Sequence, residues 1–213
     1  MSGPFGSSQW MYSSGGFYPT EIEQSLRFND DDSAYLSRTP ASAGNRKTWT
    51  WSGWVKRGNL SSLQYLFFAY GASNDTGFTG LFIETDNTIR MTGYTADMIV
   101  SSPVFRDTSA WYHIVVSVDT TQATSTNRIK LYINGVDTSY STGGSFPVQN
   151  DDMAINGAWG HSISSRNPFS NNYFFDGYLA EVNFIDGQAL APTDLGEFKS
   201  GVWVAKSYAG SYG

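Results

Sequence analysis

The sequence contains no cysteine, and this absence removes several kinds of chemistry at once. It leaves no disulfide framework, no thiolate nucleophile and no cysteine ligand for zinc, while the redox compartment stays open. The two histidines, His113 and His161, are far apart in the chain and have no third histidine beside them. We therefore expect no zinc site, and we interpret His113 as part of a sheet face. No Gly-x-Ser-x-Gly nucleophile elbow occurs either.

Positive charge and long hydrophobic runs are also scarce. The 13 Lys and Arg residues are outnumbered by 19 Asp and Glu, which gives a formal net charge of −6. This negative net charge argues against electrostatic binding to nucleic acid or to an anionic membrane. No apolar run approaches the ~18 residues that a membrane span requires, and the first residues lack the basic region and apolar core of a secretory signal. We therefore expect neither a nucleic-acid nor a membrane partner.

Alternating apolar residues are abundant, and they predict β-strands. Between Trp111 and Asp119 every second side chain falls on the same face, and Arg128 to Ile133 alternates in the same way before an Asn134-Gly135 turn. These two strands are expected to be half-buried. Similar patterns predict further strands, and almost no helix beyond one turn within 191–198. The other expected strands are 26–28, 34–37, 48–55, 64–70, 79–84, 88–92, 153–157 and 173–186.

This pattern indicates an all-β fold of about ten to twelve short strands, as in a two-sheet antiparallel jelly-roll sandwich. A single domain is expected over residues 25–198. Residues 1–24 form a Gly/Ser/aromatic N-terminal arm, and residues 199–213 form an aromatic C-terminal tail. Large apolar groups in a flexible arm favour association, so the arms either pack on their own domain or dock onto a neighbouring subunit. The expected docking residues are Phe5, Trp10, Met11, Tyr12, Phe17, Tyr18 and Trp203.

Five motifs in order along the chain resemble laminin-G-like, concanavalin A-like lectin/glucanase jelly rolls. They are Ser-Leu-Arg-Phe-Asn-Asp-Asp-Asp-Ser-Ala-Tyr-Leu-Ser (25–37), Trp-Ser-Gly-Trp-Val-Lys (51–56), Trp-Tyr-His-Ile-Val-Val-Ser-Val-Asp (111–119), Lys-Leu-Tyr-Ile-Asn-Gly-Val (130–136), and the run from Phe175 to Leu190. Each motif alone is weak, and the five together cover about residues 25–198. The resemblance implies a concanavalin A-like jelly roll.

A narrower resemblance is to virion proteins of tailed bacteriophages, notably marine ones. It is carried by the arm (residues 2–12), the run from Asn45 to Arg57, and the ending Gly-Val-Trp-Val-Ala-Lys-Ser-Tyr-Ala-Gly-Ser-Tyr-Gly (201–213). It implies a structural protein at the particle surface, made in the host cytoplasm, as a capsid decoration or a head or tail fibre module. Its partners would be a major capsid or tail protein and sister subunits. The alternative is a carbohydrate-binding host-adsorption protein with a cell-surface glycan as partner.

A glycan hydrolase is the third alternative, and the chain is not expected to be an enzyme. A retaining glycosidase needs two carboxylates ~5–5.5 Å apart, and the Glu-x-Asp-x-x-Glu strand motif of hydrolytic relatives is missing. Glu21 and Glu23 lie in the arm, and Glu181 stands alone on its strand. We expect no obligatory cofactor. Calcium is the one metal with a candidate ligand set, because Asp30, Asp31 and Asp32 supply hard oxygen ligands in one turn. The laminin-G resemblance adds Asp176 to that set; the alternative is a turn whose carboxylates bind backbone amides.

The longest polar loop with aromatic residues runs from Trp159 to Tyr173. Sugar sites use aromatic ring faces for stacking and amide, carboxylate or basic groups for hydroxyls. We therefore expect any glycan to contact this loop, and the alternative is an ordinary polar loop with aromatic anchors. The candidate ligand-binding residues are Trp159, His161, Arg166, Asn167, Asn171 and Tyr173.

Overall fold

The computed structural model describes residues 17–213 except 19, 72–76, 94–95, 141–145 and 171. In these residues the chain forms fifteen β-strands and two 3-10 turns, η2 (Ser125–Asn127) and η3 (Pro192–Asp194). The strands are β1 (Leu26–Phe28), β2 (Leu36–Arg38), β3 (Thr48–Arg57), β4 (Gln64–Tyr70), β5 (Phe78–Ile83), β6 (Ile89–Thr92), β7 (Asp97–Ser101), β8 (Tyr112–Asp119), β9 (Ile129–Ile133), β10 (Val136–Asp137), β11 (Ser139–Tyr140), β12 (His161–Ile163), β13 (Gly177–Asp186), β14 (Gly196–Lys199) and β15 (Val202–Ala205).

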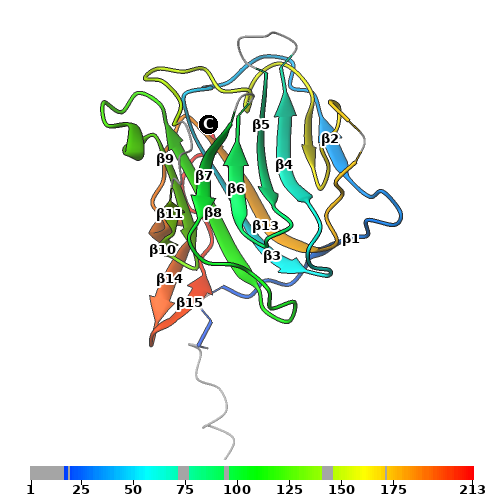
Figure 1. The fold of residues 1–213 in the computed structure, drawn as a ribbon. Helices are drawn as coiled ribbons and strands as arrows, with labels where there is room; N and C mark the ends of the chain where they lie inside the picture. The colour runs from blue at the N-terminus through cyan, green and yellow to red at the C-terminus, as the bar shows by residue number, and fades with distance from the viewer. Residues whose placement is uncertain (1–16, 19, 72–76, 94–95, 141–145, 171) are drawn as a thin grey trace, which may run out of the picture.

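The strands form two large sheets that lie one behind the other (Figure 1). Sheet A has the order β1-β13-β3-β8-β9-β10, and sheet B has the order β11-β7-β6-β5-β4-β12-β2. In the described residues, neighbouring strands of both sheets pair antiparallel. The predicted all-β jelly-roll sandwich is therefore confirmed. No helix in the described part of the chain has the length and apolar character needed to cross a membrane.

The core between the sheets follows from the alternation of apolar side chains. Along β3, Trp49, Trp51 and Val55 point into the core and are almost completely buried. On the adjacent β8, Ile114 and Val116 join the same cluster. The tight turn between β9 and β10 is also as predicted, because Asn134 and Gly135 both have positive φ angles, 49° and 78°.

The outer face of β8 is also buried. The sequence predicted that this strand would be buried on one face only. Val115 packs with Leu195 and Leu190, and His113 is covered by Trp203. These covering residues come from the end of the chain, where β14 and β15 form a hairpin. The expected tail boundary between residues 198 and 199 lies inside this hairpin.

One predicted element is wrong. Residues 153–157 form no strand; Met153, Ala154 and Ile155 lie in an irregular segment and are buried in the main core. Its backbone makes isolated hydrogen bonds instead of a strand ladder; for example, Ala154 N donates to Thr79 Oγ1 at 3.2 Å. Burial rather than strand pairing therefore explains the apolar character of the segment. The predicted single turn within 191–198 is confirmed as η3, after which the chain enters β14.

Candidate functional site

The outer face of sheet B carries an aromatic surface that is partly covered by the loop between β12 and β13. Strands β4 and β5 place Tyr65, Tyr70 and Phe78 on this outer face, opposite the core residues of the same strands. In the loop, Phe169 packs on Tyr70 and Phe78, with ring centroids 5.0 and 5.7 Å apart, and Tyr173 packs on Tyr65 at 6.2 Å. We call Arg166, Phe169 and Tyr173 the loop platform.

Arg166 is the polar group at the centre of the loop platform. Its guanidinium carbon lies 4.3 Å from the centroid of the Phe169 ring and 4.8 Å from that of Phe78. Its Nε is buried without a hydrogen-bond partner, and the guanidinium forms no ion pair within the described residues. The rings therefore hold a cation in place without a carboxylate partner in the described part of the chain.

The backbone of the loop fixes Arg166 in position. Arg166 N donates to the carbonyl of Asn172 at 3.2 Å, and its own carbonyl accepts from Ser170 N at 3.1 Å. Asn167 precedes a cis proline, and its carbonyl accepts a hydrogen bond from Ser162 Oγ at 2.8 Å. The loop is therefore tied to β12, and a contact with Arg166 would meet a held side chain.

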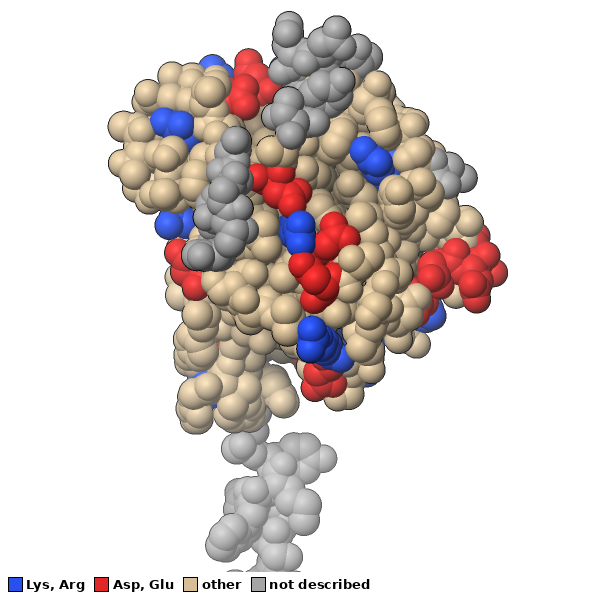
Figure 2. Space-filling view, in the orientation of Figure 1, with Lys and Arg blue, Asp and Glu red and all other residues tan. Residues whose placement is uncertain are grey.

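A second arginine on the same face, Arg90 of β6, is fully engaged. It lies 2.5 Å from Asp86 and 2.9 Å from Asp97, measured between nitrogen and oxygen. Burial opposes the ionisation of Asp86, but hydrogen bonds from Thr88 and Arg90 outweigh it and lower the pKa of that carboxyl. Figure 2 shows basic and acidic side chains next to one another near the middle of this side of the molecule. Arg90 is thus neutralised locally, whereas Arg166 is not.

The structure divides the predicted ligand-binding residues into two groups. Arg166 and Tyr173 lie on the loop platform, and Asn167 supports it. Trp159 instead donates from Nε1 to the Ala154 carbonyl at 2.6 Å, and Arg46 covers its ring at 4.8 Å. Asn171 lies outside the described residues.

His161 has a local structural role. Its Nε2 accepts from Asn156 N at 2.9 Å, its Nδ1 lies 2.8 Å from the Trp159 carbonyl, and burial lowers its pKa. It also lines a separate cavity of ≈ 500 Å³ beside Phe67 and Asp186. Sequence reasoning missed Phe169, although a large apolar ring inside a polar loop was the signal that could have identified it.

The predicted calcium ligands are not gathered. Asp176 is paired with Arg27 at 2.5 Å, Asp30 accepts from Asn59 Nδ2 at 2.9 Å, and Asp32 accepts from Asn29 Nδ2 at 2.7 Å. Among the described residues no group of three or more acidic or histidine side chains could hold a metal ion. Asp30, Asp31, Asp32 and Asp176 therefore do not fit a calcium site as a set, because Asp176 already has a cationic partner.

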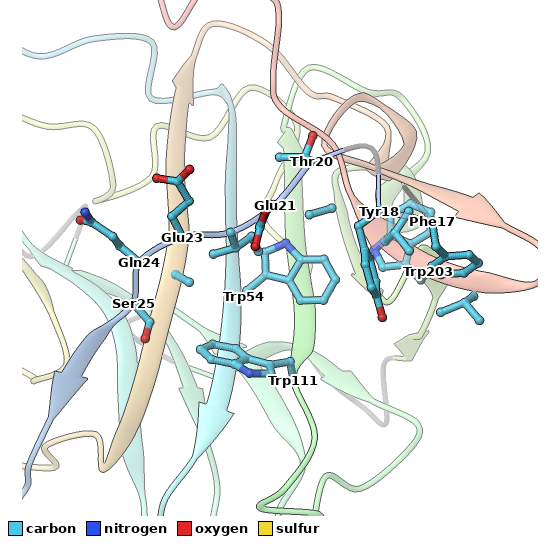
Figure 3. A pocket seen from close by; sticks show the side chains of 15 residues that line it. Phe17, Tyr18, Thr20, Glu21, Glu23, Gln24, Ser25, Trp54, Trp111 and Trp203 are labelled. Atoms are coloured by element: carbon cyan, nitrogen blue, oxygen red, sulfur yellow. The ribbon is translucent and has the colours of Figure 1, made fainter. Parts of the chain in front are cut away.

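A cavity of ≈ 650 Å³ lies on the outer face of sheet A, and we call it the arm pocket. Figure 3 shows the segment from Phe17 to Ser25 crossing the strands, with Trp54, Trp111 and Trp203 among the rings of the pocket and Glu21 and Glu23 on the crossing segment. Hydrogen bonds between Thr20 and Ser207 tie this segment to the end of the chain. The two expected arms therefore meet on one face.

Two of the predicted docking residues, Phe17 and Tyr18, line the arm pocket and are exposed by 39% and 66%. Phe5, Trp10, Met11 and Tyr12 lie outside the described residues. Trp203 was predicted to dock onto a partner, but the structure places its ring inside the fold. Its ring packs against Gly135 and Gly196, where an added Cβ would lie 2.3 and 2.4 Å away, and it is largely buried in its own fold.

Trp203 is also held by a buried hydrogen-bond chain. Its Nε1 donates to His113 Nδ1 at 3.0 Å, and His113 Nε2 lies 2.9 Å from Ser52 Oγ. Because Nδ1 accepts, the neutral ring carries its proton on Nε2 and donates it to the serine. Trp54 stacks on the same imidazole at 4.8 Å, and burial lowers the pKa of His113 to about 4. His113 is therefore a neutral part of the sheet face, as expected.

Comparison with solved structures agrees with this architecture. A native heptameric SAP-like pentraxin from Limulus polyphemus is 15% identical over 82% of this chain and 76% of that chain, with a TM-score of 0.52. A putative carbohydrate binding protein from Bacteroides ovatus is 15% identical, covering 82% of this chain and 46% of that chain, with a TM-score of 0.56. Domains LG4-5 of the mouse laminin alpha1 chain are 12% identical, covering 76% and 41%, with a TM-score of 0.53.

At these identities the likeness establishes the fold alone, and this chain spans less than half of the last two proteins. A search of curated protein sequences finds no significant match. The family model described as the concanavalin A-like lectin/glucanases superfamily matches residues 29–195, which is most of the chain. The predicted resemblance to laminin-G-like jelly rolls is confirmed, and the chain belongs to the concanavalin A-like lectin/glucanases superfamily.

Proposed function

We propose that this chain is a non-catalytic carbohydrate-binding domain whose glycan site is the loop platform. The observation that carries the proposal is Arg166, a guanidinium packed among aromatic rings with no carboxylate partner in the described residues. Membership of a lectin-containing superfamily supports the class of function. The proposal does not depend on calcium, because the predicted calcium ligands do not fit a site as a set.

The geometry of the platform supports sugar recognition in two ways. Phe169 and Tyr173 remain exposed by 44% and 40%, so each presents ring surface on which the C–H face of a pyranose can stack. Arg166 supplies several N–H donors that hydroxyl or carboxylate oxygens of a glycan can accept. A few fixed polar groups among aromatic rings are the usual composition of a small-ligand site.

The test is a glycan array with the purified protein, followed by calorimetry on the best ligand. Arg166→Gln removes the charge and the planar fork, and we expect it to weaken binding by about tenfold or more, since hydrogen bonds to charged groups contribute ~1.5–3 kcal/mol. Arg38→Gln is the matched control, because Arg38 is an exposed arginine of β2 in the same sheet. A protein that binds no glycan, or an Arg166→Gln variant that binds as wild type does, would contradict the proposal.

Hydrolysis is not part of the proposal. The two carboxylates that flank Arg90 on this face are tied into ion pairs with it, and Glu21 and Glu23 lie in the arm pocket on the other sheet. A glycosidase instead needs a free acid and a second carboxylate on either side of the scissile bond. We expect no release of reducing sugar from any glycan that binds on the array.

A second role, attachment to a virion, is supported by the opposite face. Exposed aromatic and apolar side chains gather there, and patches of this kind mark interaction sites; they are Phe17, Tyr18, Trp111, Phe198 and Val202. The resemblance of the arm and the chain ending to bacteriophage virion proteins supports a particle partner, either a capsid or tail protein or a sister subunit. We expect a variant lacking residues 2–18 to fold and yet fail to join particles. Normal incorporation of that variant would contradict the attachment role.

A further inference from the structure

The arm pocket combines aromatic walls with two glutamates among its lining residues. Its rings are Phe17, Tyr18, Trp54, Trp111 and Trp203, and its fifteen lining residues include two glutamates but no lysine, arginine or histidine. Glu21 and Glu23 are exposed and form no ion pair within the described residues. A ligand that enters this pocket therefore meets ring faces and carboxylates, and no fixed cation among the lining side chains.

This composition selects a cation. The faces of Trp and Tyr rings carry partial negative charge and attract guanidinium and ammonium groups within about 6 Å of the ring centroid. At the edge of the pocket, Lys199 Nζ lies 5.8 Å from the centroid of Phe17, within the range of such contacts. The carboxylates of the lining residues add hydrogen-bond acceptors that a planar guanidinium can use in pairs.

We propose that the arm pocket binds a basic side chain, most favourably an arginine, presented by a partner protein. The volume of ≈ 650 Å³ accommodates such a side chain together with adjoining backbone. Arginine matches the pocket better than lysine because its flat group can stack on an indole while it donates to a carboxylate. This proposal takes from the attachment role only the idea that the partner is a protein. It adds that the pocket recognises a basic side chain of that partner.

The arginine preference can be measured on the full chain without knowing the partner. The probe is the capped tripeptide acetyl-Gly-Arg-Gly-amide, and its matched control carries citrulline, which has the same shape without the charge. Binding is followed by indole N–H shifts of Trp54 and Trp111 and by tryptophan fluorescence. We expect a saturable shift with a dissociation constant of about a millimolar for arginine, and about tenfold weaker binding for citrulline.

The role of the carboxylates is tested by single substitutions. Glu21→Gln and Glu23→Gln are each expected to weaken arginine binding by about threefold or more and to reduce its dependence on salt. Glu84→Gln, which removes one glutamate after β5 in the other sheet, is the control and should bind as wild type does. Thermal unfolding of each variant should be unchanged, because both glutamates of the pocket are exposed.

Three outcomes would overturn the proposal: no shift at Trp54 or Trp111, equal binding of the arginine and citrulline peptides, or tighter binding of a neutral sugar at the same indoles. Failure of the attachment role would appear differently. A variant lacking residues 2–18 that still joins particles would refute attachment, whereas the peptide result reports on the preference of the pocket alone.

Discussion

Acid should weaken the contact between the β14–β15 hairpin and sheet A, because His113 must stay neutral to accept the Trp203 hydrogen bond. Burial lowers the pKa of His113 from 6.5 to about 4 in the folded protein. Between these values the unfolded chain binds a proton that the folded chain does not. Stability is therefore fully present above pH 6.5 and is lost as the pH falls toward 4.

The magnitude follows from the two pKa values. Lowering the pH from 7 to 5 should remove about 2 kcal/mol of the free energy of unfolding through His113 alone. For a domain of this size that loss corresponds to a fall of about 4–8 °C in the unfolding temperature. His161 contributes in the same direction, since burial also lowers its pKa. The diagnostic quantity is therefore the difference in pH dependence between wild type and a His113 variant.

The assay is urea unfolding at pH 7 and pH 5 of wild type and His113→Gln, followed by tryptophan fluorescence. Glutamine can accept from Trp203 and donate to Ser52, and it does not titrate. The variant should lose about 2 kcal/mol less than wild type over this pH range. His161→Gln serves as a control, because that variant should retain the part of the pH dependence that comes from His113. If wild type and His113→Gln lose the same free energy of unfolding between pH 7 and pH 5, His113 does not cause the acid destabilisation.

Three further predictions concern stability and ligand binding. Gly196→Ala should lower the free energy of unfolding by about 1–3 kcal/mol in urea titrations, because the new Cβ would meet the Trp203 ring at 2.4 Å. Trp159→Ala should destabilise the fold by about 2–4 kcal/mol, since its ring packs on the core and donates to Ala154; calorimetry on the folded variant should find glycan affinity unchanged, and a selective loss of affinity would return Trp159 to the site. EDTA should leave both glycan affinity and the unfolding temperature unchanged. A fall in either quantity would show that the protein binds a metal ion, contrary to the pairing of Asp176 with Arg27.

The strand pattern could be predicted from sequence because alternation is a local property. Along β3 and β8 the predicted alternation agrees with the structure, in which Trp49, Trp51 and Val116 share the core side. The burial of the other side was not predictable, since it depends on Trp203 reaching His113 across 90 residues of sequence. The same long-range contact explains why Trp203 was predicted to dock a partner, when it is part of the fold.

The candidate site was predictable only in part. Composition drew attention to the segment from Trp159 to Tyr173, and the structure shows that β12 lies within it and separates Trp159 from Arg166. The apolar run at 153–157 was predicted as a strand because buried loops and strands share the same residue types. The acidic turn at 30–32 suggested calcium on its residue types alone, and the sequence could not show that Arg27 pairs with Asp176.

Mapping a bound glycan onto the structure shows whether the loop platform is the glycan site. Amide and side-chain shifts of the full chain would be recorded during titration with the best glycan from the array. We expect the shifts to concentrate at Arg166, Phe169 and Tyr173 and on the outer face of β4 and β5. Shifts confined to Phe17–Ser25, Trp111 and Trp203, with the loop platform unchanged, would contradict this expectation.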